Sequence, residues 1–182
     1  MVVTIPRPGD PVDINELGKE HIEIWQKATG GGSAIALGLV VCLPPNSSTC
    51  AAAVTGDFGR FGVVARLGDN YDSTTGRGTL NTDTSAQVVV ITNGGRAYVT
   101  GSGTIKKNSE VQAASTGKIA QYVESTWSST TPGDFQTPLR EDAKKVGVYE
   151  GHYGESLQAA GEPPTDASNA QANLILRTRE FA

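Results

Sequence analysis

Short runs of Val, Ile, Leu and Tyr recur along the chain of 182 residues, and each run ends at Gly, Pro, Asn, Ser or Thr. Such runs between turn residues are typical of β-strands, whereas helices need longer periodic segments. The 22 glycines and the single methionine agree with many tight turns and few helices. We therefore expect an all-β fold, with strands at residues 21–27, 34–43 with a bend at Gly38, 61–67, 87–92, 96–100, 117–124, 146–150 and 173–177.

Asn93 and Gly94 separate two of these expected strands, 87–92 and 96–100. Both residue types tolerate positive φ angles, and a two-residue Asn-Gly turn matches the twist of the strands it joins. The sequence therefore predicts a β-hairpin at this point.

An internal repeat is indicated by three short matches in the same order along the chain. Ile35, Gly38 and Val41 match Ile105, Asn108 and Val111 at an offset of 105 − 35 = 70. Gly and Asn are the residues that most readily adopt a left-handed turn. Residues 61–64 then match 146–149, and 89–91 match 174–176, both at an offset of 85. The alternative is that a β protein rich in Val and Gly produces such matches by chance.

The repeat and the turn-rich stretches suggest an organisation in parts. We expect an extended N-terminal arm at residues 1–15, a first β module at 16–92, and a second β module at 93–182. The increase in offset from 70 to 85 predicts an insertion in the second module, and the Ser/Thr/Pro/Gly stretch near 126–137 is its natural place. The modules are expected to be small barrels or sandwich-like sheets.

The arm contains three prolines, which make a helix implausible. Fully extended, 15 residues at about 3.3 Å each would reach on the order of 50 Å, enough to cross a neighbouring subunit. Apolar side chains on an extended segment gain most by docking on another surface, so we expect partner contacts from Val2, Val3, Ile5, Pro6 and Ile14. The alternative is a loose terminus without a partner.

Charge and hydropathy argue against two classes of partner. The net charge of −4 and the pI near 5.2 give no basic surface for a phosphate backbone, so no nucleic acid is expected. The longest apolar run, 34–43, is about half of the roughly 20 residues that span a bilayer, so no membrane insertion is expected. Met1 leads into no basic and apolar signal sequence, which indicates synthesis in a cytosol.

Four segments carry a resemblance to a known family. They are Gly101-Ser-Gly-Thr-Ile-Lys-Lys-Asn-Ser-Glu-Val111, Ala113-Ala-Ser-Thr-Gly-Lys118, Lys145-Val-Gly-Val-Tyr149, and the closing apolar run 173–177. Over residues 30–178 the chain resembles the β-barrel head decoration (cement) proteins of tailed bacteriophages. The resemblance implies a structural virion protein made in the host cytoplasm, which binds the major capsid protein on the outer capsid surface as a homo-oligomer such as a trimer. The arm and the insertion near 126–137 exceed a minimal cement barrel.

An enzymatic function is not expected. The two histidines each have carboxylates nearby, Glu20 and Glu23 beside His21, and Glu150 and Glu155 beside His152. Side chains two residues apart on a strand share a face, so His21 with Glu23, or Glu150 with His152, could hold a metal or transfer a proton. Two ligands do not complete a metal site, and solvated polar faces are the simpler interpretation. We therefore assign no catalytic residue, metal or cofactor.

A carbohydrate- or receptor-binding β domain is the main alternative, and another β-rich virion component such as a tail or fibre-base protein is also compatible with the sequence. Sugar binding would use aromatic faces, which seven side chains could supply, although most are expected to pack in the core. These side chains are Trp25, Tyr71, Tyr98, Tyr122, Trp127, Tyr149 and Tyr153.

Cys42 and Cys50 flank a loop with two prolines that could bring their thiols together. A disulfide is one interpretation. Two reduced thiols, packed as small apolar side chains, are the other.

Overall fold

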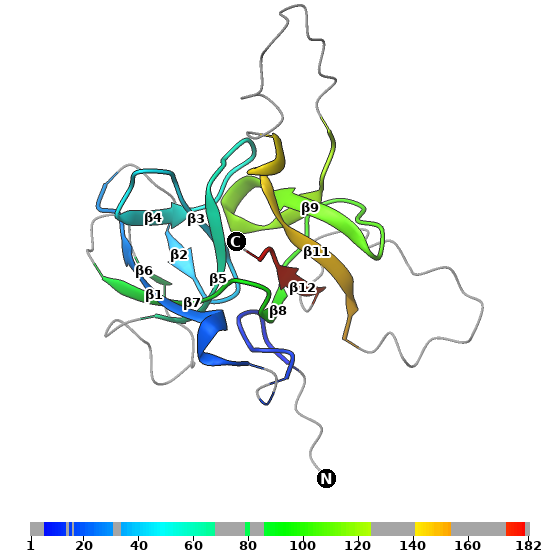
Figure 1. Ribbon diagram of the computed structural model, residues 1–182, viewed down its shortest axis with the longest axis horizontal. Coiled ribbons are helices and arrows are strands. Elements are labelled where there is room, and N and C mark those ends of the chain that lie inside the picture. Colours follow the sequence, from blue (N-terminus) through cyan, green and yellow to red (C-terminus); the bar gives the residue numbers. More distant parts are fainter. Residues whose placement is uncertain are drawn as a thin grey trace, which may run out of the picture.

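The computed structural model describes residues 6–13, 15, 17–30, 34–67, 79–80, 86–124, 141–153 and 174–180, and these form an all-β protein (Figure 1). Within the described residues, twelve strands make two five-stranded sheets and a separate two-stranded pair. Beside the strands the described residues contain two 3-10 turns, Lys19–His21 and Ser115–Gly117, and a helical turn at Glu141 and Asp142. The predicted all-β fold with two β modules is confirmed.

The first module is a closed barrel in the order β1-β4-β3-β5-β7. All its neighbouring strands are antiparallel except β1 and β4, which run parallel. The bounds of its strands are β1 Ile22–Lys27, β3 Val40–Leu43, β4 Thr49–Ala52, β5 Arg60–Leu67 and β7 Gln87–Ile91. The separate pair consists of β2 (Ile35–Ala36) and β6 (Thr79–Leu80).

The second module is an antiparallel sheet in the order β10-β9-β11-β12-β8, drawn to the right of the barrel in Figure 1. Its edge strands approach each other at an isolated parallel bridge between Gly101 and Ile119. The bounds of its strands are β8 Arg96–Val99, β9 Ser109–Ala113, β10 Ile119–Gln121, β11 Lys145–His152 and β12 Leu174–Thr178.

The predicted hairpin at Asn93 and Gly94 is wrong. The turn itself forms, with φ of 53° at Asn93 and 86° at Gly94, and the Gly95 amide donates to the Thr92 carbonyl at 3.0 Å. The strands on either side nevertheless belong to different sheets, because β7 pairs with β1 and β5 whereas β8 pairs with β12. The predicted turn therefore forms, but pairing with strands distant in sequence places β7 and β8 in different sheets.

The two modules share strand order, and their pairing register agrees except where β11 shifts against β9 between Lys145 and Gly147, since β5 pairs with β3 without a shift. In the first module Val41 pairs with Gly62, and in the second Val111 pairs with Gly147, at the offsets of 70 and 85 expected from the repeat. Both long strands also carry a bulge at the same place: β5 shifts register against β7 between Val64 and Arg66, and β11 shifts against β12 between Tyr149 and Gly151. The internal repeat is therefore confirmed as a structural duplication.

The pairing also corrects the third sequence match by one residue. Val64 pairs with Val90, while its equivalent Tyr149 pairs with Leu176, so β7 and β12 are related by 176 − 90 = 86 and not by 85. The same comparison makes β1 equivalent to β8, because Ile24 pairs with Val89 and Tyr98 pairs with Ile175. The stretch near 126–137, where we expected the insertion, lies outside the described residues.

The contacts that close each sheet also lie at equivalent positions of the two modules. In the barrel, Lys27 pairs in parallel with Cys50, and the Ala28 amide donates to the Cys50 carbonyl at 2.8 Å. In the second sheet the corresponding contacts are the bridge from Gly101 to Ile119 and a 2.8 Å hydrogen bond from the Ser102 amide to the Ile119 carbonyl. Both sheets therefore close between equivalent strands, and in each the closing contacts lie at one end of the strand, at Lys27 and Ala28 in the barrel and at Gly101 and Ser102 in the second sheet.

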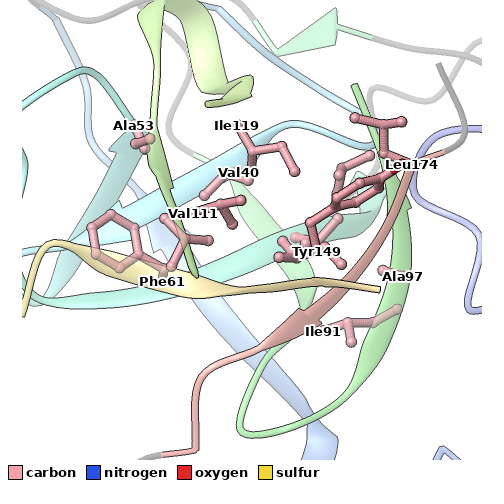
Figure 2. Packing of buried hydrophobic residues seen from close by; sticks show 14 of the residues in the cluster. Val40, Ala53, Phe61, Ile91, Ala97, Val111, Ile119, Tyr149 and Leu174 are labelled. Carbon is pink, nitrogen blue, oxygen red and sulfur yellow. The ribbon is translucent and has the colours of Figure 1, made fainter. Parts of the chain in front are cut away.

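Strand β5 is buried on both faces and joins the two cores. Val64 packs with Trp25 inside the barrel, whereas Phe61 and Val63 belong to a second cluster that contains the interior of the second module. Figure 2 shows Phe61 beside Val111 within this second cluster. Because one continuous apolar cluster includes side chains of both modules, the modules form a single packed body.

The left-handed turns predicted at Gly38 and Asn108 are both present, with φ of 76° and 60°. The Gly38 amide donates to the Val64 carbonyl at 2.8 Å, and the Asn108 amide donates to the Tyr149 carbonyl at 2.7 Å. The two turns differ in what covers them. A Cβ atom at Gly38 would lie 2.2 Å from the Cβ of Pro8, so the first turn requires glycine for close approach as well as for its φ.

Candidate functional site

The N-terminal arm is the first candidate binding element, and part of it is fixed to the chain's own second module. The Gly9 amide donates to the Tyr98 carbonyl at 2.8 Å, the Tyr98 amide to the Asp10 carbonyl at 2.9 Å, and the Val12 amide to the Arg96 carbonyl at 3.1 Å. Pro11 forms an antiparallel bridge with Ala97. Residues 9–12 therefore add a short strand to the free edge of β8.

The predicted contact residues of the arm fall almost entirely on undescribed positions. Val2, Val3, Ile5 and Ile14 lie outside the described residues, and Pro6 is partly buried. We expected an extended segment that docks on another surface, and residues 9–12 dock on their own chain. Contacts between the other arm residues and a partner stay a prediction.

Strand β1 is the second candidate surface, because its outward side is apolar. Ile24 is 64% exposed and Ile22 is 41% exposed, whereas Trp25 on the inward side is only 5% exposed. The indole Nε1 of Trp25 donates to the Glu23 carboxylate at 2.8 Å, so the one polar atom of the buried ring is satisfied. The barrel thus uses the tryptophan as core and leaves two isoleucines on the surface.

A groove of about 480 Å³ lies where the two modules meet. One wall is the loop after β3 together with the start of β5, and the other comes from the second module. Its lining residues are Leu43, Pro44, Pro45, Asn46, Ser47, Gly59, Arg60, Asp142, Ala143 and Arg179. A hydrogen bond of 3.1 Å from the Gly59 amide to the Ala143 carbonyl fixes the two walls relative to each other.

Charged groups in and beside this groove pair with one another. Arg179 donates to both the carboxylate and the backbone carbonyl of Asp142, and the Lys145 ammonium lies 2.9 Å from Glu110 and 3.4 Å from Asp142. Partial burial alone would raise the pKa of Asp142, but the hydrogen bond and charge of Arg179, followed by those of Lys145, outweigh burial and lower it. The hydrogen bond to Glu110 is the largest of the effects that raise the pKa of Lys145. Paired in this way, the network favours structural support over capture of a free ion.

Comparison with known proteins adds nothing to this geometry. Neither a family model, nor a curated protein, nor a solved structure matches this chain. The described residues also contain no helix long and apolar enough to cross a membrane.

His21 lies in the 3-10 turn before β1 and not in the expected strand. Its Nδ1 forms a 2.8 Å hydrogen bond with the Asn93 carbonyl, and its Nε2 lies 3.6 Å from the Glu20 carboxylate. Glu23 instead pairs with Arg60 and accepts from Trp25. His21 therefore helps to hold the link between the modules, while Glu23 supports the barrel.

The expectation that Glu150 and His152 share a face is wrong, because the bulge in β11 changes the alternation. Glu150 turns outward, where Arg96 and Arg177 approach its two oxygens at 2.7 and 2.6 Å. His152 lies on the side of Tyr149, with its Nδ1 3.3 Å from the Tyr149 hydroxyl. Among the described residues, no group of three His, Cys, Asp or Glu side chains could hold a metal ion.

Cys42 and Cys50 are free and face opposite sides of the sheet. Cys42 pairs across the strands with Ala51, so the next residue along β4, Cys50, points to the other face. Cys42 accordingly belongs to the core shared by the modules and Cys50 to the barrel interior. Burial raises the pKa of Cys42 to about 12 and that of Cys50 to about 11, which makes both thiols poor nucleophiles.

Of the seven aromatic candidates, the structure describes five, and three of these five are buried. Buried aromatics among the seven candidates are Trp25, Tyr98 and Tyr149. The Lys145 ammonium lies 5.3 Å from the ring centroid of Tyr122, and Tyr153, which is 40% exposed, meets Tyr98 edge-on with centroids 6.4 Å apart. The other two, Tyr71 and Trp127, lie outside the described residues.

Sequence reasoning missed the groove and the ion pairs around Asp142. The chain offers only a weak signal for them: charged residues recur at 141–145 and at 177–180, about 35 residues apart. They meet because β11 and β12 pair, with Gly147 opposite Thr178. Only knowledge of that register could have brought Asp142 and Arg179 together.

Proposed function

We propose that this chain is a structural virion protein that binds the outer surface of a bacteriophage capsid lattice and stabilises the head without catalysing a reaction. The observation that carries the proposal is the arm. Residues 9–12 are hydrogen-bonded to β8, which ties the arm to the folded body, and the apolar residues 1–5 precede this fixed point in the sequence. A short apolar segment anchored in this way suits docking on a neighbouring protein.

The remaining features support binding rather than chemistry. The two histidines have structural partners, Asn93 for His21 and Tyr149 for His152, and both thiols are buried with raised pKa values. The charges around Asp142 are paired. A duplicated barrel with a continuous core provides rigidity, and many copies on a lattice need only a modest interface each because their contacts act together.

Co-sedimentation with tailed-phage heads stripped of their own decoration protein tests the proposal. We expect saturable binding of the full chain, and at least a tenfold loss of affinity when Val2, Val3 and Ile5 are all replaced by Ser. Val123→Ser is the matched control, because it removes one exposed apolar side chain (69% exposed) from another surface. Failure of the full chain to bind any such head contradicts the proposal.

A carbohydrate- or receptor-binding function is the second candidate, and one observation favours it. Tyr153 offers a partly exposed ring supported edge-on by Tyr98, as a stacking platform for a sugar would be. Glycan-array binding by the full chain that is lost in Tyr153→Ala, together with no binding to heads, would favour this candidate.

A further inference from the structure

One edge of β1 is open, and the hydrogen bonds around it show which backbone groups it presents. The Thr92 amide donates to the His21 carbonyl at 2.9 Å, and the Lys27 amide donates to the Ala86 carbonyl at 2.8 Å. The backbone amides and carbonyls of the odd-numbered residues of β1 therefore point towards β7. The backbone amides and carbonyls of Ile22 and Ile24 point to the opposite edge of the strand. On that opposite edge β4 pairs only with Gln26 and Lys27. Ile24 pairs with Val89 of β7 on its other edge, but on the edge towards β4 no described strand pairs with it.

The duplicated module shows what fits such an edge. Ile22 and Ile24 are equivalent in register to Arg96 and Tyr98 of β8. In β8 the corresponding three groups, the Arg96 carbonyl and the Tyr98 amide and carbonyl, are the ones that residues 9–12 of the arm satisfy. The edge of β1 thus presents the same backbone pattern without an arm on it.

We propose that the open edge of β1 binds Met1–Ile5 of a second copy of this chain as an added strand. In the sequence, the prolines at positions 6 and 8 separate residues 1–5 from residues 9–12, and residues 9–12 are already used on β8. Residues 1–5, Met-Val-Val-Thr-Ile, have an amide at every position after Met1 and four β-branched side chains, which suit a strand. It would also cover Ile22 and Ile24, the exposed apolar side chains of the edge.

Ring order indicates that the strand comes from a second copy. In the barrel order β1-β4-β3-β5-β7, the junction between β1 and β4 lies across the ring from β5. The arm is held beside β5, since a Cβ on Gly9 would lie 2.8 Å from the Val64 carbonyl oxygen. Five residues in an extended strand span about 17 Å at 3.3–3.4 Å each. Pairing along the β1 edge would use this whole length, so residues 1–5 of the same chain would have no residues left to cross the barrel from β5 to that edge.

This contact is heterologous, because the arm of one copy meets the β1 edge of the next. Repeated contacts of this kind close into a ring or continue as a filament, and a closed ring leaves no arm and no edge unused. The inference concerns association of the chain with itself in the absence of heads, so its test does not use the proposed capsid role. In such a ring the neighbouring protein on which residues 1–5 dock is the next copy of the chain, and the loss of head binding expected when Val2, Val3 and Ile5 are replaced would follow from loss of the ring.

Complementation between two variants tests the proposal by light scattering coupled to size-exclusion chromatography. Ile24→Lys places a charge on the edge, and deletion of residues 1–5 removes the strand. We expect the full chain, whose monomer mass is 19.0 kDa, to form an oligomer, each variant to fall to its own monomer mass, and a mixture of the two to form a 1:1 dimer. Only that mixture offers one intact arm and one intact edge on different chains.

The matched control is Val123→Lys, which adds the same charge at an exposed valine of the second module and should remain oligomeric. Circular dichroism and thermal unfolding of each variant establish that it is folded. A monomeric full chain, an oligomeric Ile24→Lys variant, or a mixture that does not associate would each overturn the proposal. A monomeric full chain whose Ile24→Lys variant loses binding to heads would assign the edge to a strand of the capsid protein instead.

Discussion

Gly38 and Asn108 occupy equivalent left-handed turns, and the difference between them reflects what lies above each turn. Both donate to the equivalent carbonyl of the long strand, Val64 for Gly38 and Tyr149 for Asn108. Pro8 packs directly on Gly38, whereas the second turn retains a side chain. The turn alone would accept either glycine or asparagine, and the contact with Pro8 of the arm is what requires glycine at position 38.

Exchange of the two residues separates turn geometry from close packing. Gly38→Asn keeps a residue that tolerates positive φ but forces a side chain against Pro8, so we expect a loss of about 1–3 kcal/mol in the free energy of unfolding. Asn108→Gly should change it by less than about 1 kcal/mol, since only chain entropy differs. Urea denaturation of both variants measures this, and equal losses would show that Pro8 does not restrict position 38.

At the scale of elements, the arm and β8 form a strand pair that begins and ends within four arm residues. Pro8 and Pro11 lack amides, so the outer edge of this added strand has few donors and does not invite another strand. The pair therefore extends the second sheet and blunts its edge at the same time. By contrast, β4 pairs with the equivalent edge of β1 only at Gln26 and Lys27, and no described strand lies on this edge at Ile22 and Ile24.

Hydrogen exchange of individual amides tests the arm pairing. The Tyr98 amide donates to Asp10, whereas β8 is held on its other side by β12. Deletion of residues 1–12 should accelerate exchange of the Tyr98 amide at least tenfold and leave the neighbouring Ala97 and Val99 amides nearly unchanged. Equal acceleration of all three would mean that the deletion loosens the whole sheet.

At the scale of the whole molecule, the duplicated modules are not used symmetrically. The outward positions Val40, Val63 and Ile91 of the first module pack in the shared core. Their equivalents in the second module are Glu110, Val148 and Arg177, which line a surface groove. The first module therefore has an apolar outer face to bury, and the second has a charged one that faces solvent.

Phe61 tests whether the two modules unfold together. Its side chain is fully buried in the shared core, so Phe61→Ala should lower the free energy of unfolding by about 3–5 kcal/mol. Calorimetry should show one transition at a lower midpoint, and the fluorescence of Trp25 in the barrel should follow it. Two separate transitions would show that each module is stable without the other.

The sequence by itself determined the strands, the left-handed turns and the repeat. These features depend on local residue choice. Alternating apolar side chains favour a strand, and Gly38 and Asn108 favour left-handed turns whichever strands pair beside them. The short strands β4 and β9 were not predicted as separate strands, because Thr49–Ala52 and Ser109–Ala113 carry few large apolar side chains. The Asn93-Gly94 turn was predicted correctly as a turn and wrongly as a hairpin.

Tertiary structure alone decided which strands pair and which side chains meet. The bulge that separates Glu150 from His152, the opposite faces of Cys42 and Cys50, and the meeting of Asp142 with Arg179 all follow from register between strands distant in sequence. A one-residue change of register moves every side chain of a strand to the other face, and burial of one face fixes that register. Local sequence therefore determines where strands and turns form, while burial in the shared core determines which strands pair and in which register.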